Sequence, residues 1–352
     1  MNDGSVWCWG EPAPGEPPRL KSVNGPKRLL GPGPRGSFFV GKGSWCEVSL
    51  SGTASCTRPG SPEKDPLVLD ETEHVAIGSA HSCVIRRRGE LWCWGDNAFG
   101  QLFDGSTASA DHPVRAIPER ADIRGVAVGD GFTCVVEGEG EVDCRGAQIG
   151  PEVHAGLAGM GNTALEVVAG TAHACARFRS GNVRCWGKND EGQLGDSTLV
   201  ERVAPVDVAL PGPAKELSAY GDQTCAILAN AHVDCWGGPL TGWTAGRKTG
   251  GTPTEIRTDD ETKHHPPLAD AIQIATGVGH GCVVLQGGAV SCWGHNEELQ
   301  AFARPRLFPS KGVDSTGDSE RCATVRWIEL PAYSAAAVFW AEGSSTRPRR
   351  AW

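Results

Sequence analysis

Residues 170–195 read GTAHACARFRSGNVRCWGKNDEGQLG, and the pattern of this stretch decides the fold. Its two cysteines, Cys175 and Cys185, lie ten positions apart. A glycine stands five positions before the first cysteine, and Trp-Gly follows the second. The unit recurs along the chain at intervals of 37 to 57 residues, which is typical of a solenoid, a propeller or an array. The pairs with the ten-residue spacing are Cys46 with Cys56, Cys83 with Cys93, Cys134 with Cys144, Cys175 with Cys185, Cys225 with Cys235, and Cys282 with Cys292.

Apolar residues within a unit alternate with a period of two, which predicts strands rather than helices. In one copy, Val75-Ala76-Ile77 precedes a turn, Cys83-Val84-Ile85 follows, and a second turn leads to Leu91-Trp92-Cys93-Trp94. The turn between the two cysteines folds them onto adjacent antiparallel strands, at a separation that a disulfide accepts. Each unit is therefore one small antiparallel sheet that cannot bury its own faces. Sheets stacked radially cover one another and leave only short edges.

Two cysteines remain, and they lie near opposite ends of the chain. Cys8 has the Trp-Gly context of a second cysteine, whereas Cys322 has the preceding glycine of a first cysteine. Joined head to tail they make a seventh pair. We therefore expect an all-β, seven-bladed β-propeller over residues 1–330, closed by the N-terminal strand in the C-terminal blade. In the alternative, Ala337-Val338-Phe339-Trp340 closes the last blade and Cys8 stays unpaired. We expect residues 331–352 to be a poorly ordered tail.

The copy at residues 170–195 resembles the repeat of the regulator of chromosome condensation family, whose members form seven-bladed propellers. The residues that carry the resemblance are Gly170, His173, Cys175, Cys185-Trp186-Gly187, Asn189 and Gly192-Gln193-Leu194-Gly195. Two further copies share much of it, with His81, Cys83, Cys93-Trp94-Gly95, Asn97 and Gly100-Gln101-Leu102, and with His280, Cys282, Cys292-Trp293-Gly294 and Asn296. The regular cysteine pairing is more similar to the bacterial branch of the family than to the eukaryotic nuclear one.

The composition argues against several classes of function. A formal net charge of −9 disfavours a general nucleic-acid binder, because phosphate contacts need a basic surface. No apolar run approaches the roughly 18 residues of a membrane span. Met1 does not begin a recognisable signal peptide, yet paired cysteines in every unit favour an oxidising compartment. We expect an extracellular or cell-envelope protein whose export signal is not visible, or a cytoplasmic protein if the cysteines are reduced.

The pattern indicates neither a catalytic site nor a metal site. Structural zinc sites use short spacings such as Cys-x2-Cys, whereas a ten-residue hairpin supplies two sulfurs per unit. Two sets of polar residues recur at fixed repeat positions, namely His81, His173 and His280, and Asn97, Asn189 and Asn296. A ring separates such residues widely, so we expect both sets to bond the backbone of their own turns. Without a phosphate loop or a nucleophile elbow, we expect no cofactor and no enzyme activity.

The segment between Cys235 and Cys282 is the most individual part of the chain. Loops on a rigid scaffold commonly carry binding function, and an aromatic residue beside arginine is a typical interface anchor. The candidate partner-binding residues are Trp243, Arg247 and Lys248. The simpler alternative is a solvated loop. The weak candidates for holding a metal are His264 and His265, which lie near acidic residues.

The leading functional hypothesis is a monomeric, non-enzymatic propeller whose loops bind a protein or cell-surface partner. Nucleotide exchange on a small GTPase is what resemblance to the eukaryotic family member implies, but that family's GTPase-contacting residues cannot be matched onto this chain position by position, and the extracellular type of cysteine usage argues against it. A third hypothesis is inhibition of an extracellular enzyme, because an inhibitor of β-lactamases is similar to the same propeller family. Fold alone does not choose among these functions.

Overall fold

The computed structural model describes residues 6–10, 23–30, 37–41, 44–57, 67–116, 122–147, 163–238, 251–256, 268–277, 280–286, 290–294, 324–325 and 341–342. Within these ranges the regular structure is β-strand, with no α-helix, so the expected all-β class is confirmed. Six antiparallel sheets of three or four strands follow one another along the chain, and we number them blade 1 to blade 6.

The strands of the first three blades are β3 (Ser37–Gly41), β4 (Ser44–Val48), β5 (Ala54–Cys56) and β6 (Leu67–Leu69); β7 (Thr72–Ile77), β8 (His81–Arg86), β9 (Glu90–Gly95) and β10 (Ala110–Arg115); and β11 (Ile123–Val128), β12 (Phe132–Glu137) and β13 (Glu141–Gly146). Those of the next three are β14 (Ala164–Ala169), β15 (His173–Phe178), β16 (Val183–Gly187) and β17 (Arg202–Asp207); β18 (Ala214–Tyr220), β19 (Gln223–Leu228), β20 (Val233–Trp236) and β21 (Thr254–Glu255); and β22 (Ala271–Gly277), β23 (His280–Leu285) and β24 (Val290–Gly294).

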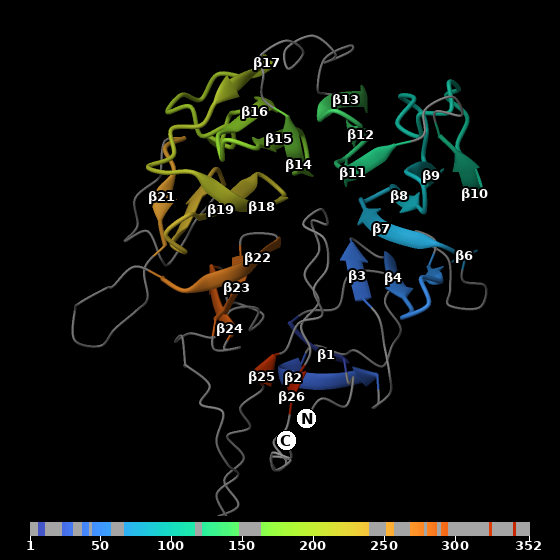
Figure 1. The fold of residues 1–352 in the computed structure, drawn as a ribbon, viewed down its shortest axis with the longest axis horizontal. Coiled ribbons are helices and arrows are strands. Elements are labelled where there is room, and N and C mark those ends of the chain that lie inside the picture. Colours follow the sequence, from blue (N-terminus) through green and yellow to red (C-terminus); the bar gives the residue numbers. More distant parts are fainter. Residues whose placement is uncertain are drawn as a thin grey trace, which may run out of the picture.

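The blades are arranged around a common centre, with the first strand of each blade innermost (Figure 1). Strand order within a blade follows the sequence, so each blade is a simple meander that runs from the centre outward. This is the arrangement of a β-propeller, which leaves only short sheet edges exposed.

Two short ladders lie outside the six blades. β1 (Val6–Gly10) pairs with β2 (Val23–Leu30), and β25 (Thr324–Val325) pairs with β26 (Ala341–Glu342). In Figure 1 both ladders fall in the sector between β24 and β3. Cys322 lies outside the described residues, so the seventh blade and the Cys8–Cys322 closure stay predictions. The boundary at residue 330 also stays a prediction.

The predicted register of the six ten-residue cysteine pairs is confirmed. In every blade the two cysteines face each other directly across the ladder between the second and third strands. Cys134 of β12 is bonded to Cys144 of β13, for example, although this copy lacks the tryptophan that usually follows the second cysteine. All six pairs are joined as disulfides, with Cα–Cα distances of 4.0 to 4.1 Å. One covalent bond thus fixes the register at the middle of each blade.

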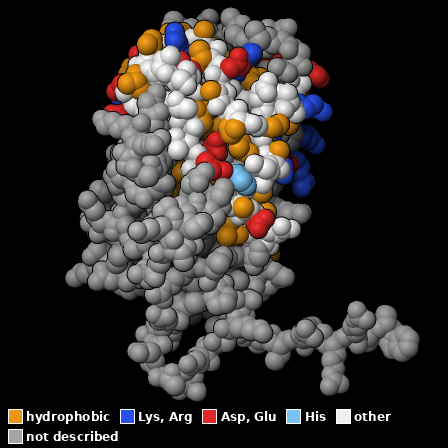
Figure 2. Space-filling view, turned by 90° about the vertical axis from the view of Figure 1, so that its left-hand side faces the viewer, with side chains coloured by type: hydrophobic (Ala, Val, Ile, Leu, Met, Phe, Trp, Pro, Cys, Tyr) orange, Lys and Arg blue, Asp and Glu red, His pale blue; other side chains and the backbone are white. Residues whose placement is uncertain are grey.

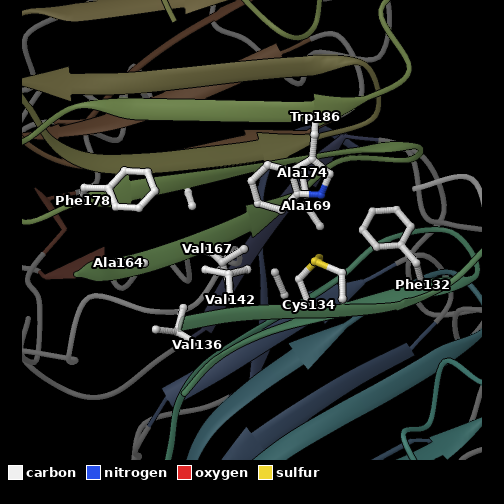
Figure 3. Packing of buried hydrophobic residues seen from close by; sticks show 13 residues of the cluster. Phe132, Cys134, Val136, Val142, Ala164, Val167, Ala169, Ala174, Phe178 and Trp186 are labelled. Atoms are coloured by element: carbon white, nitrogen blue, oxygen red, sulfur yellow. A yellow bond between two sulfur atoms is a disulfide. The ribbon is translucent and has the colours of Figure 1, made fainter. Parts of the chain in front are cut away.

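The hydrophobic core lies between blades rather than inside them. Between blades 3 and 4, Phe132 and Val136 of β12 pack with Val167 of β14 and Trp186 of β16 (Figure 3). Four tryptophans that follow a second cysteine are almost fully buried, namely Trp94, Trp186, Trp236 and Trp293. Burying a large apolar side chain stabilises a fold by about 1.5–3 kcal/mol. The tryptophan after the second cysteine is therefore a main contributor to the contact between neighbouring blades.

Two carboxyl groups, the buried Glu166 and the partly buried Glu216, also connect the innermost strands of neighbouring blades. The ladder of β14 has an irregularity before Glu166, and that of β18 has one before Glu216. Glu166 Oε1 accepts a hydrogen bond from Leu217 N of blade 5 at 3.4 Å, and Glu216 Oε1 accepts one from Ile274 N of blade 6 at 3.1 Å. Arg177 Nε donates to Glu166 Oε2 at 2.8 Å.

The environment of these two carboxyl groups favours their protonated forms. Burial raises the pKa of Glu166 to about 7, although Arg177 acts in the opposite direction. Burial, and next the charge of Glu166, raise the pKa of Glu216 to about 8. Because both pKa values exceed the ordinary value of 4.5, their contribution to stability is present in full below pH 4.5 and is lost as pH rises through 7 and 8.

We therefore expect the free energy of unfolding of the wild-type protein to fall between about pH 5 and pH 9. In Glu216→Gln this fall should be smaller by roughly 1–2 kcal/mol. Chemical denaturation at a series of pH values measures this quantity. Glu139→Gln, at an exposed position on the β12–β13 turn, is the matched control and should keep the wild-type slope. An unchanged slope in Glu216→Gln would contradict the assignment.

Candidate functional site

The connections between strands form two groups at opposite ends of the strands. Asp96 N, after the third strand of blade 2, donates to Ala80 O in the turn between the first and second strands at 2.9 Å. Ile123 N, at the start of the first strand of blade 3, donates to Gly89 O in the hairpin between the second and third strands of blade 2 at 3.1 Å. We call the end with the first-to-second turns and the third-to-fourth loops the loop face, and the other end the hairpin face.

The loop between β9 and β10 is organised by one buried amide. Asn97 Nδ2 lies 3.1 Å from Asp104 Oδ1, from Ser106 O and from Ala108 O. Its Oδ1 accepts a hydrogen bond from Leu102 N at 2.9 Å. The side chain is fully buried, so these bonds replace the water that it has lost.

The loop between β16 and β17 repeats this arrangement. Asn189 Nδ2 lies 3.1 Å from Asp196 Oδ1, 3.0 Å from Thr198 O and 3.1 Å from Val200 O, while Leu194 N donates to its Oδ1 at 2.9 Å. The prediction that these asparagines bond the backbone of their own turns is confirmed for Asn97 and Asn189. Asn296 lies outside the described residues.

A glutamine four residues after each asparagine also fixes the loop, by a side-chain hydrogen bond to its backbone. Gln101 Oε1 accepts from Phe99 N at 2.8 Å, and Gln193 Oε1 accepts from Glu191 N at 2.9 Å. Gln193 Nε2 also donates to Asp222 Oδ1 in the β18–β19 turn of blade 5 at 3.2 Å. Gln193 therefore attaches the blade 4 loop to the next blade. In the sequence, these glutamines are recognised only as part of the family's repeat motif, and no structural role is predicted for them.

The turns of neighbouring blades are joined in series on the loop face. Ser79 Oγ of blade 2 donates to Asp130 Oδ1 of blade 3. Asp130 N donates to Thr171 O of blade 4 at 2.9 Å, and Thr171 N donates to Gly221 O of blade 5 at 2.7 Å. The first-to-second turns of blades 2 to 5 thus form one connected belt on this face.

The recurring histidines connect blades, and the prediction of a bond to their own turn backbone is wrong for two of them. His81 Nε2 lies 2.7 Å from Thr133 Oγ1 of blade 3, and His173 Nε2 lies 2.7 Å from Thr224 Oγ1 of blade 5. Burial lowers the pKa of His81 to about 4 and that of His173 to about 3, so both rings are neutral at pH 7. His280 begins β23, at the equivalent position of blade 6.

Carboxylates dominate the loop face at residues 78–80, 96–109, 129–131, 170–172, 188–201 and 221–222, and its other described residues, 57, 147, 237–238 and 251–253, carry no charge. The acidic residues in the first six ranges are Asp96, Asp104, Asp130, Asp190, Glu191, Asp196, Glu201 and Asp222, and the one basic residue there is Lys188. Lys188 Nζ lies 2.9 Å from Asp190 Oδ2 and lowers the pKa of that carboxyl group. Hydrogen bonds from Ser106 and Asn97 lower the pKa of Asp104 and outweigh the opposing effect of its burial.

The hairpin face has a different balance of charge. Its described turns carry the basic residues Arg87, Arg88 and Arg179 and the acidic residues Asp70, Glu71, Asp122, Glu139 and Asp270. Figure 2 views the molecule from the side of β17 and β21. Lys and Arg side chains gather along the right-hand edge of this view, while carboxylates are spread across its centre and upper part.

Large apolar side chains are also exposed on the loop face. Phe99 is 58% exposed, Leu199 is 56% exposed and Val200 is 55% exposed, and all three lie in the two asparagine-held loops. A Cβ atom built on Gly131 would lie 3.4 Å from Phe99 Cδ2, so the ring sits against the blade 3 turn that carries Asp130. These loops therefore present apolar side chains and carboxylates together on a fixed backbone.

The candidate partner-binding residues Trp243, Arg247 and Lys248 lie outside the described residues, as do His264 and His265. The described residues that flank residues 239–250 are on the loop face. Ser197 N donates to Gly251 O at 3.1 Å, and Thr252 Oγ1 donates to Ser197 Oγ at 3.2 Å. The sequence did not point to the exposed Phe99, Leu199 and Val200 of the β9–β10 and β16–β17 loops. These residues lie within or just after a repeat motif whose predicted role is structural.

Metal-binding clusters and membrane-spanning helices are both missing from the described part of the chain. It contains no group of three or more His, Cys, Asp or Glu side chains placed to hold a metal ion. It also contains no helix that is long and apolar enough to cross a bilayer.

Comparisons with known proteins agree with the repeat and with the fold. The family model of the Regulator of chromosome condensation (RCC1) repeat matches residues 73–101, 165–193 and 271–300, and a second model with that description matches residues 88–136. The chain is an all-β protein of propeller type. It carries repeats of the regulator of chromosome condensation family, as its sequence predicts.

Three curated relatives are similar to part of the chain. Human E3 ubiquitin-protein ligase HERC2 is 31% identical over 153 residues, which cover 39% of this chain and 3% of that protein. Ultraviolet-B receptor UVR8 of Arabidopsis thaliana is 27% identical over 182 residues, covering 46% of this chain and 40% of the relative. Regulator of chromosome condensation of Mus musculus is 27% identical over 155 residues, covering 42% and 35%. The matches span less than half of each relative.

Two solved structures have a similar fold over most of their length. Human WBSCR16 has a TM-score of 0.66 at 20% identity, covering 86% of this chain and 91% of that chain. Prp20p of Saccharomyces cerevisiae has a TM-score of 0.64 at 17% identity, covering 85% and 84%. At this identity the likeness concerns the fold alone.

We expect Asn189→Ala to lower the free energy of unfolding by about 2–4 kcal/mol, because several buried partners lose their hydrogen bonds at once. Hydrogen exchange should accelerate at Leu194 N and at other amides of the β16–β17 loop. Asn182→Ala, at an exposed position in the β15–β16 hairpin, is the control and should change stability by less than about 0.5 kcal/mol. Equal effects of the two substitutions would show that Asn189 does not hold the loop.

Proposed function

We propose that this protein is a non-enzymatic scaffold: a seven-bladed propeller, closed by its N-terminal strand, that binds a protein or cell-surface partner through its loop face. The observation that carries the proposal is the pair of loops fastened by Asn97 and Asn189. Loops that are already ordered lose little conformational entropy on binding. The exposed apolar side chains of these loops would be buried by a partner, which favours binding.

Two observations support binding rather than catalysis. The recurring histidines are used in pairs with threonines of the next blade, at separate places around the ring. Similar folds are also known in protein complexes, since one solved structure is described as Kap60 bound to yeast RCC1 (Prp20). The carboxylates of the loop face further favour a partner other than nucleic acid, because phosphates would be repelled.

Nucleotide exchange on a small GTPase is the second candidate. Its main support is that Prp20p, a protein of similar fold, is described together with its binding to Gsp1p and histones. No contact within the described residues favours this activity over binding of another protein. A nucleotide-release assay with candidate GTPases separates the two.

We further propose that the protein works as a monomer outside the cytoplasm, in an extracellular or cell-envelope setting. Six disulfides at equivalent places in six blades support this location. Thiol titration of the denatured, unreduced protein should find few free thiols, and none beyond background if Cys8 and Cys322 are also joined. A value near the 14 cysteines of the chain would contradict the oxidised state and the location inferred from it.

The binding role is tested by site-specific photo-crosslinking in cells that express the full chain. A photoreactive residue at Thr107 or Glu191 on the loop face should capture a partner, whereas the same residue at Glu139 or Asn182 on the hairpin face should not. Deletion of residues 243–265 tests the contribution of the long insertion to the same captured band. Capture from the hairpin face alone would contradict the proposal.

A further inference from the structure

We infer that the loop face docks a basic segment of its protein partner, one in which arginine or lysine residues alternate with apolar residues. The inference deepens the proposed function and rests on it. It concerns the described segments of the loop face and does not depend on the long insertion.

The apolar part of the surface is built from two loops on different blades. Phe99 belongs to blade 2, and Leu199 and Val200 belong to blade 4; each is more than half exposed. Hydrogen bonds from buried side chains fix the backbone of these residues: Phe99 N donates to Gln101 Oε1, and Val200 O accepts from Asn189 Nδ2. Fixed, exposed aromatic and aliphatic side chains are the usual anchors of a protein interface.

Carboxylates lie near both anchor loops. Phe99 packs against the turn that carries Asp130, an exposed residue. Glu201 directly follows Val200, and Glu191 and Asp190 occupy exposed positions of the same loop. Asp222 is drawn toward this loop by its bond to Gln193. A partner that covers either loop therefore meets carboxylates next to the exposed apolar side chains.

The negative charge of the loop face favours a partner of positive charge. Within the described segments of this face, the one lysine is already paired with Asp190. An acidic partner would bring like charges together in a region that loses water on binding, which is unfavourable. A basic segment would gain charge-assisted hydrogen bonds, and its apolar residues would contact Phe99 in one loop or Leu199 and Val200 in the other. Mixed basic and apolar chemistry is thus the complement of this surface.

The experiment uses the full chain and three labelled dodecapeptides as probes: alternating arginine and leucine, alternating glutamate and leucine, and alternating arginine and serine. Fluorescence anisotropy measures their affinities. We expect the arginine–leucine peptide to bind at least about tenfold more tightly than either other peptide. Its affinity should fall several-fold between about 50 mM and about 300 mM salt, because exposed charges are screened.

Variants on the two faces separate a specific site from general attraction to an acidic protein. Asp130→Asn with Glu191→Gln removes two charges from the loop face and should weaken binding about tenfold, and Phe99→Ser should weaken it similarly. The controls lie on the hairpin face: Glu71→Gln with Glu139→Gln removes the same number of charges, and Leu50→Ser removes an apolar side chain that is 66% exposed. These controls should stay within about twofold of the wild-type affinity.

Equal losses in the variants of both faces, or equal binding of the arginine and glutamate peptides, would overturn the inference. So would failure of the arginine–leucine peptide to bind at all. A partner crosslinked from Thr107 that proves acidic would leave the proposed function intact and overturn only the basic chemistry assigned here. A basic partner crosslinked from the hairpin face alone would overturn both.

Discussion

A sheet of three or four short strands has two apolar faces that its own residues cannot cover, and this constraint determines the structure of the chain. Each blade buries its faces against its neighbours, and the large side chains at these contacts include Trp94, Trp186 and Trp236. A shift of one residue between two strands would turn every side chain to the opposite face. The disulfide at the centre of each blade prevents such a shift, so the same residues always meet at the contacts between blades.

Apolar packing is not directional, so polar bonds add the orientation that it lacks. His173 reaches Thr224, Ser218 Oγ lies 2.9 Å from Thr276 Oγ1, and Glu216 accepts from Ile274 N; each of these bonds joins two adjacent blades. The first two bonds are buried and the third is partly buried, so losing one partner would leave the other unsatisfied at a cost of about 1–3 kcal/mol. These bonds fix how blades 4, 5 and 6 are oriented relative to one another, and the turns of blades 4 and 5 belong to the belt on the loop face.

Sequence reasoning predicted the all-β class, the blade centres and the cysteine register, because ten-residue hairpins with alternating apolar residues have few other solutions. It failed for His81 and His173, whose partners lie about fifty residues away. A signal was present, since a threonine directly precedes the first cysteine of the following blade in both cases. The role of Glu166 was also missed, because the irregularity before it breaks the alternation from which burial is inferred. The exposure of Phe99 depends on how its loop folds back on the blade, which local spacing does not determine.

In the two loops held by asparagine, one set of side chains fixes the loop backbone and a different set faces solvent. Asn97, Gln101, Asn189 and Gln193 point inward and are fully buried, whereas Ala98, Phe99, Glu191 and Leu199 point outward. The outward positions can therefore change identity with little effect on folding, much as the hypervariable loops of an antibody do on their framework. Such loops are a natural display platform, and we expect that new recognition specificities can be selected on them by randomising the outward positions alone.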